Sequence, residues 1–202
     1  RIAYVFSESP ELTADLGRGY IDGFQTTIGN KNGWGNKSVN AMVKHWPGGG
    51  PEEGGRDGHW AMGKFAVYPG NNFQNHVKPF TEGAFKLAGG TKEASAVMPY
   101  YTISFNQDTK NGENVGNGYS KYLITDLLRG KYKYDGVVCT DWLITADEPK
   151  SPGGFAGKPW GAEKLSIAER HYKVLEAGVD QFGGNNDKAP VLEAYQMGVK
   201  EH

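Results

Sequence analysis

Apolar residues along this chain form two kinds of pattern. Short, nearly continuous apolar runs occur at residues 39–46, 94–98 and 137–139, and such runs predict strands buried on both faces, as in a parallel sheet. Apolar residues three or four positions apart predict helices over residues 73–87, 119–129, 165–177 and 190–200, and residues 179–182 could add a short strand. The chain therefore repeats the order strand, loop, helix.

The first helix is predicted to begin at Pro10. Proline is tolerated in a first helical turn, the Ser9 side chain can cap the helix, and the acidic Glu11 favours its dipole. Glycine and asparagine follow the predicted end, at residues 29–30. Four apolar residues recur at helical spacing along it: Leu12, Leu16, Tyr20 and Phe24.

The loops differ in length at the two ends of the predicted strands. Long glycine-rich loops follow the strands, whereas short turns follow the helices, and the chain contains 30 glycines. This asymmetry places the working face at the carboxyl ends of the strands. The predicted fold is α/β: a partial (β/α)8 TIM-type barrel of about four to five consecutive β/α units, since a complete barrel needs about 250 residues.

Composition excludes several classes of function. The 202 residues include 22 basic and 23 acidic side chains, a net charge of −1, which gives no electrostatic reason to expect nucleic acid or an anionic membrane as partner. No apolar run approaches the roughly 18 to 20 residues that span a bilayer. The single cysteine, Cys139, lies inside an apolar run and is expected in the core. The histidines lack metal-ligand spacing, so we expect neither a metal nor a cofactor.

Asp141 is the first candidate for chemistry. It follows the apolar run at residues 137–139, so it would stand at the mouth of a crevice where parallel strands present their functional groups. The alternative is that Asp141 only turns the chain after a strand, as most such aspartates do.

Four stretches resemble the catalytic barrel of glycoside hydrolase family 3. The first joins Arg1 to Ser-Glu-Ser-Pro-Glu-Leu at residues 7–12, and the second is Val-Lys-His-Trp-Pro-Gly-Gly-Gly at 43–50. The third is Ala-Val-Met-Pro-Tyr-Tyr at residues 96–101. The fourth combines Leu-Ile-Thr-Asp-Leu-Leu-Arg with Tyr-Asp-Gly-Val-Val-Cys-Thr-Asp-Trp, which ends at residue 142. They follow the family's order and span nearly the whole chain.

The resemblance implies a retaining, exo-acting β-glycosidase of the β-glucosidase type. Asp141 matches the family's nucleophile, which attacks the anomeric carbon and forms a covalent glycosyl-enzyme that water later opens. Trp142 would border the sugar, although a tryptophan after a strand can also be a core residue. Further substrate contacts are implied at Arg1, Lys44, His45, Met98 and Tyr101.

The second carboxyl of a retaining pair is expected outside this chain. The family's acid/base usually comes from an α/β sandwich domain that follows the barrel, and the early barrel units would precede Arg1. Residues 1–202 are therefore expected to form part of the N-terminal (β/α)8 catalytic domain, completed by other segments or chains of the same enzyme. Within the chain, Glu113 is the substitute considered for the acid/base.

Other assignments stay open at this stage. One alternative is a carbohydrate-binding barrel without turnover; others are a β-xylosidase or an N-acetylglucosaminidase of the same family. The last branch carries a histidine-containing proton-relay loop after its Lys-His motif, but residues 52–56 fill much of that loop here. Arg56 and Asp57 could support Lys44 or the sugar. A calcium loop at residues 108–113 is rejected because Lys110 occupies a ligand position. The family suggests a periplasmic or secreted location.

Overall fold

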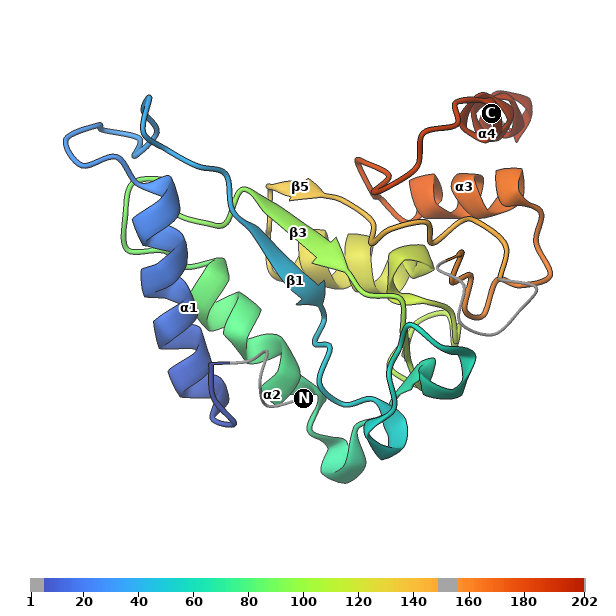
Figure 1. The fold of residues 1–202 in the computed structure, drawn as a ribbon, viewed down its shortest axis with the longest axis horizontal. Coiled ribbons are helices and arrows are strands. Elements are labelled where there is room, and N and C mark those ends of the chain that lie inside the picture. Colours follow the sequence, from blue (N-terminus) through green and yellow to red (C-terminus); the bar gives the residue numbers. More distant parts are fainter. Residues whose placement is uncertain (1–5, 149–155, 202) are drawn as a thin grey trace.

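The computed structural model of the chain describes residues 6–148 and 156–201. Four α-helices, two π-helical segments and five short strands form its framework (Figure 1). In chain order the strands are β1 (Met42–Trp46), β2 (Phe65–Ala66), β3 (Ala96–Pro99), β4 (Ile103–Ser104) and β5 (Val137–Val138). The helices are α1 (Pro10–Gln25), α2 (Phe73–Lys78), η5 (Pro79–Ala84), η7 (Tyr122–Lys131), α3 (Ile167–Glu176) and α4 (Ala189–Glu201). Short 3-10 turns lie at Glu53–Gly55, Ala61–Gly63, Pro69–Asn71 and Asn117–Tyr119.

The main sheet is parallel, in the order β1-β3-β5. Its strands point in the same direction in Figure 1 and are joined by helical crossovers, so the α/β class is confirmed. Beyond β5, a parallel bridge joins Cys139 to Gln181, and this is all that forms of the short strand expected at residues 179–182. The small strands β2 and β4 pair with each other in the loops after β1 and β3.

The two faces of the main sheet differ in burial. Val43, Val97 and Val138 are register partners on one face, where Val97 and Val138 are fully buried beneath the helices. Met42 and Val137, one position away, remain 40% and 42% exposed. Successive side chains of a strand point to opposite faces, so one face is packed against the helices, while the other is exposed at Met42 and Val137 and buried at Met98 and Cys139.

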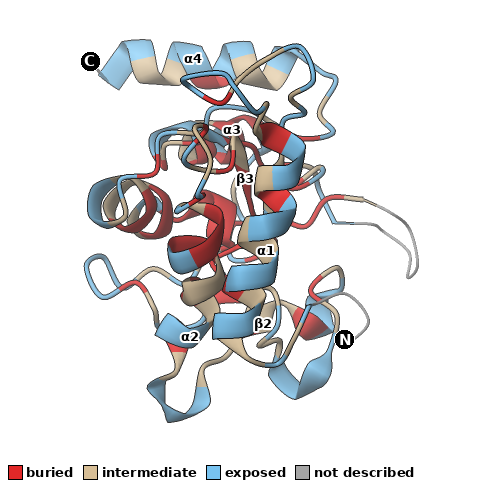
Figure 2. Cartoon of the chain, turned by 90° about the vertical axis from the view of Figure 1, so that its left-hand side faces the viewer, coloured by how far each residue is buried: buried red, intermediate tan, exposed pale blue. Residues whose placement is uncertain are grey.

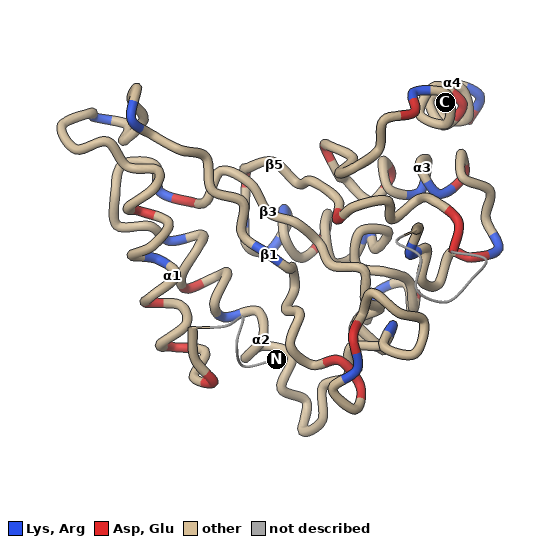
Figure 3. Tube along the Cα trace, viewed as in Figure 1, with Lys and Arg blue, Asp and Glu red and all other residues tan. Residues whose placement is uncertain are grey.

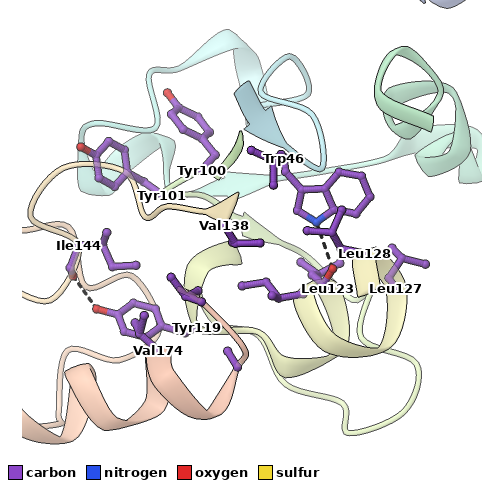
Figure 4. Close-up of a cluster of buried hydrophobic side chains, with 14 of the residues drawn as sticks. Trp46, Tyr100, Tyr101, Tyr119, Leu123, Leu127, Leu128, Val138, Ile144 and Val174 are labelled. Atoms are coloured by element: carbon purple, nitrogen blue, oxygen red, sulfur yellow. Dashed lines mark hydrogen bonds between the residues drawn. The ribbon is translucent and has the colours of Figure 1, made fainter. Parts of the chain in front are cut away.

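The core fills the space between the sheet and η7. Figure 4 shows Trp46, Leu123, Leu127, Leu128 and Val138 converging there. The indole Nε1 of Trp46 donates a hydrogen bond to the Leu123 carbonyl oxygen at 3.1 Å. A buried indole N–H needs such a partner, so the bond fixes how η7 lies against β1.

Helix α1 begins as expected but presents its apolar row outward. The Ser9 side chain accepts a hydrogen bond from the Leu12 amide, as an N-cap should. Leu12, Leu16, Tyr20 and Phe24 are between 43% and 60% exposed, whereas Ala14, Ile21 and Gln25 are the buried residues of the helix. Figure 2 shows this exposed side of α1.

The other helices lie within a few residues of their predicted ranges. The stretch expected to be one helix over residues 73–87 divides at Pro79, where α2 passes into the π-helical η5. Proline lacks an amide hydrogen and cannot continue the regular hydrogen-bond ladder. Helix α3 begins with a complete capping box between Ser166 and Glu169.

Charge is distributed evenly over the molecule. Basic and acidic residues are interspersed along α1, α3 and the loops (Figure 3). In the parts of the chain that the structure describes, no helix combines the length and apolar character needed to cross a membrane.

Candidate active site

The candidate site lies where the main strands end. His45 is near the end of β1, Tyr100 and Tyr101 directly follow β3, and Asp141 follows β5 by three residues. In a parallel sheet these carboxyl ends meet at one edge, which explains how residues nearly 100 positions apart reach one place.

Asp141 is the centre of this group. Its side chain is 11% exposed, and its Oδ2 lies 3.2 Å from Nε2 of His45. The Trp142 amide donates a hydrogen bond to Oδ1 at 2.7 Å. Apart from the His45 contact, Oδ2 has no hydrogen-bond partner among the described residues. One carboxylate oxygen is thus held by the backbone, and the other lies against the His45 ring.

The surroundings keep Asp141 ionised. Burial by itself raises the pKa of this carboxyl, but His45, the Trp142 amide and the Tyr101 hydroxyl together lower it below its usual value. The Trp142 amide favours the charged form through its hydrogen bond, and His45 does so through its contact with Oδ2. The carboxylate therefore has the protonation state that a nucleophile requires.

Two tyrosines after β3 form the wall beside Asp141. The Tyr101 hydroxyl donates to the Trp142 carbonyl oxygen at 2.8 Å, and burial together with the Asp141 charge raises the pKa of Tyr101. The Tyr100 ring lies 4.3 Å from the His45 ring. Both tyrosines are buried, and Figure 4 shows them side by side.

The other predicted substrate-binding residues, Met98, Lys44 and Arg1, have no described contact with the Asp141 carboxylate. Met98 is buried on β3 and pairs in register with Lys44, whose side chain is exposed. Continuing the register by one residue places Cys139 beside Met98. The side chains of Lys44, Met98 and Cys139 therefore share one face of the sheet, and Cys139 belongs to the stretch that leads to Asp141. Among the described contacts, however, His45 and not Lys44 touches the carboxylate. Arg1 lies outside the described residues.

Trp142 is 45% exposed, and its indole ring packs against two glycines. A Cβ atom on Gly183 would fall 2.4 Å from the indole ring, and one on Gly184 would fall 2.9 Å from it. Gly184 also has a φ of 66°, in the left-handed region. The glycine pair therefore makes room for the indole beside Asp141, a role that the sequence analysis did not assign.

A histidine-aspartate pair was also missed. His59, in the loop after β1, has Nδ1 2.7 Å from Oδ1 of Asp57, and its ring lies 5.1 Å from the Tyr101 ring. The Trp160 indole donates to the carbonyl of Gly58 at 2.9 Å, which holds this pair from the loop after β5. The Asp-Gly-His spacing was visible in the sequence, but its proximity to the site was not.

Glu113, the in-chain substitute considered for the acid/base, is paired with a lysine. The carboxylate of Glu113 accepts a hydrogen bond from Nζ of Lys173 on α3 at 2.7 Å, so it is engaged in an ion pair.

Within residues 6–148 and 156–201, no group of three or more histidine, cysteine, aspartate or glutamate side chains could hold a metal ion.

Known proteins resemble this chain over nearly its whole length. A periplasmic beta-glucosidase/beta-xylosidase of Dickeya chrysanthemi is 44% identical over 98% of the chain, and beta-glucosidase C of Emericella nidulans is 39% identical over 98%. The chain spans only 31% and 30% of these relatives.

Solved structures agree on the fold. A Listeria innocua beta-glucosidase in complex with glucose matches all of this chain with a TM-score of 0.70 at 19% identity, over 24% of its own length. The sequence profile of the Glycosyl hydrolase family 3 N terminal domain matches residues 2–197. With Asp141 buried at the end of a parallel strand, that match shows that this chain belongs to glycoside hydrolase family 3.

Proposed function

We propose that this chain carries the nucleophile of a retaining, exo-acting β-glycosidase of the β-glucosidase type. The carboxylate of Asp141 attacks the anomeric carbon, the glycosidic bond to the leaving oxygen breaks, and water later opens the glycosyl-enzyme. The observation that carries the proposal is the setting of Asp141: it is buried just after a parallel strand, with Oδ2 3.2 Å from Nε2 of His45, and its neighbours hold the carboxyl pKa below its usual value. The beta-glucosidase names of its relatives support the substrate class.

Around Asp141, we assign the sugar contacts to the side chains at the same edge of the sheet. His45, Met98, Tyr101 and Trp142 lie on or directly after the strands, and Lys44 faces the open side of β1. Arg1 completes the proposed set. Exposed Trp142 offers a flat apolar surface, which suits the face of a sugar ring.

The chain is further proposed to be part of a (β/α)8 barrel. Support comes from the sequential parallel order β1-β3-β5, the exposed Met42 and Val137 on the second face of the sheet, and the greater length of the relatives. Further barrel units and an α/β sandwich domain in the longer polypeptide would complete the site. The periplasmic name of the Dickeya relative supports a location outside the cytoplasm.

The acid/base that protonates the leaving oxygen is proposed to come from outside these residues. Glu113 is the weaker candidate because Lys173 holds its carboxylate in an ion pair. A second candidate within the chain is His59, since Asp57 contacts its Nδ1 and its ring lies 5.1 Å from the ring of Tyr101. That arrangement favours the alternative of a histidine-relayed enzyme of the N-acetylglucosaminidase kind.

Covalent trapping tests the proposed function. The full-length polypeptide is incubated with a 2-fluoro glucoside that bears a good leaving group, and the labelled peptide is mapped. We expect the label on Asp141 and none in an Asp141→Asn variant. A label on another carboxylate, or binding without turnover of an activated aryl glucoside, overturns the assignment.

The same aryl glucosides distinguish the two proton donors. Loss of a general acid costs roughly 10²–10⁴-fold on poor leaving groups and little on activated ones. If His59 is the donor, His59→Gln shows this difference; if the donor lies outside the chain, His59→Gln affects both substrates alike.

A further inference from the structure

A buried polar network joins α3 to the segment that packs against Trp142. It consists of the side chains of Thr145, His171 and Asn185, and Thr145 and His171 are each 1% exposed. Nδ2 of Asn185 lies 2.9 Å from Nε2 of His171 and 2.9 Å from Oγ1 of Thr145. Buried polar groups are costly unless they are paired, so such a network holds its members in one arrangement. Neither the sequence motifs nor the proposed chemistry uses it.

The neighbours of His171 determine which of its ring nitrogens carries the proton. Nδ1 lies 2.8 Å from the Ile167 carbonyl oxygen, which can only accept, so Nδ1 is the donor. Burial lowers the pKa of His171, which favours the neutral ring, and Nε2 of a neutral ring then accepts from the Asn185 amide. Oδ1 of Asn185 has no hydrogen-bond partner among the described residues, so this side chain is held through Nδ2.

Two glycines precede Asn185 and pack against the Trp142 indole, where a Cβ atom on them would fall 2.4 Å and 2.9 Å from the ring. The amide of the first, Gly183, donates to Oγ1 of Thr140 at 2.8 Å. The carbonyl oxygen of Gly183 accepts from the Leu143 amide at 3.2 Å. The glycine pair is thus bound to the residues around Trp142 at one end and to α3 through Asn185 at the other.

We propose that His171 and Asn185 are positioning residues that hold the glycine pair against Trp142 and so place its indole for the sugar. This inference rests on the proposed function, because the network acts through the sugar contact assigned to Trp142. The indole is 45% exposed, so part of it is packed while the rest can meet a ligand. A ring binds a sugar well only when its own neighbours hold it in place, and the network supplies that support from α3.

The test compares Asn185→Ala with Thr125→Val in the full-length polypeptide. Asn185→Ala removes the amide that joins the glycine pair to α3. We expect it to raise KM for an aryl β-glucoside about threefold to tenfold, the range that one lost hydrogen bond or ring contact gives, with little change in kcat. Thr125→Val is the control: it removes a hydroxyl that donates to the Ala177 carbonyl oxygen at 2.9 Å, at the other end of α3, and should leave KM unchanged.

A double-mutant cycle shows whether the effect passes through Trp142. In a Trp142→Ala background, Asn185→Ala should raise KM no further, because substitutions that act on one contact are not additive. His171→Phe, which keeps a ring but removes both nitrogens, should raise KM as Asn185→Ala does. A loss of stability alone would leave the cycle additive, and thermal unfolding monitors folding.

The outcomes separate this inference from the proposed function. A wild-type KM for folded Asn185→Ala, or additive effects in the cycle, overturns the positioning role, while a 2-fluoro glucoside label on Asp141 leaves the proposed function in place. A label on another carboxylate overturns the proposed function and this inference with it. If Asn185→Ala does not fold, Thr145→Val, which removes only the hydroxyl of the network, is measured against the same expectations.

Discussion

At the residue scale, the neighbours of Asp141 act on one carboxylate in opposite directions. Desolvation raises its pKa, while His45, the Trp142 amide and Tyr101 lower it by more. Of these, the Trp142 amide is backbone, so replacing the Trp142 side chain with any residue but proline leaves it in place. His45 is the side chain in direct ion-pair distance, at 3.2 Å, so it is the position where the balance can be tested.

Replacing His45 by Ala should raise the pKa of Asp141. Without the imidazole, fewer groups offset the increase that burial causes in the carboxyl pKa. The carboxylate then protonates at a higher pH, so activity is lost earlier as the pH falls. The measurement is the acidic limb of kcat/KM in the full-length polypeptide. Lys44→Ala is the matched control on the same strand: it should weaken substrate binding and move the limb less. A larger shift for Lys44→Ala than for His45→Ala would contradict the contacts described.

At the scale of elements, the loops after β1 and β5 are joined over the site. Besides the bond from the Trp160 indole to Gly58, Nζ of Lys64 lies 3.1 Å from Oε1 of Glu163. Partly exposed ion pairs of this kind contribute little, typically below about 1 kcal/mol. The buried indole bond is therefore the stronger link, and it attaches between Asp57 and His59.

Trp160→Phe and Trp46→Phe should separate stability from activity. Both indoles are fully buried and both donate to a backbone carbonyl, so each substitution removes one hydrogen bond and should cost about 1–3 kcal/mol of unfolding free energy. Only Trp160 holds a loop of the candidate site. We expect Trp160→Phe to reduce kcat/KM and Trp46→Phe to leave it nearly unchanged. Equal losses of activity at equal losses of stability would exclude this role for Trp160.

At the scale of the whole molecule, the outward row of α1 indicates a further packing partner. Leu16 is 45% exposed and Tyr20 is 60% exposed, and the ring of Tyr20 contacts the ring of Phe24 at 4.8 Å. An apolar stripe on one helix is usually matched by another element of the same domain. Under the barrel proposal, the neighbouring unit of the longer polypeptide would cover this row.

Leu16→Glu should therefore destabilise the longer polypeptide much more than the isolated 202-residue chain. A charge forced into a packed helix interface without a partner costs about 3 kcal/mol or more, whereas at an exposed position it costs little. Urea unfolding of both proteins gives the two differences in free energy. Ile28→Glu, at a position 96% exposed and beyond the end of α1, is the control and should be neutral in both. If Leu16→Glu lowers the unfolding free energy of both proteins equally, the inference that the longer polypeptide covers this row is refuted.

Local patterns determined much of the fold before any contact was known. The N-cap at Ser9, the helical spacing along α1 and the apolar run before Asp141 are properties of neighbouring residues, and the structure places a helix or strand at each. Periodicity gives the type of an element because it reflects the geometry of the backbone itself. The same local motifs carried the family resemblance, which the profile match over residues 2–197 confirmed.

Only the tertiary structure decided which faces are covered and which side chains meet. The apolar row of α1 has the spacing of a buried face, yet Ala14 and Ile21 pack inward instead, because burial depends on the neighbouring elements. The approach of His45 to Asp141, of His59 to Tyr101, and of Lys158 to Tyr101 joins residues 42 to 96 positions apart. Such contacts depend on strand order, register and loop anchoring, and these properties belong to the assembled sheet and not to any one stretch of sequence.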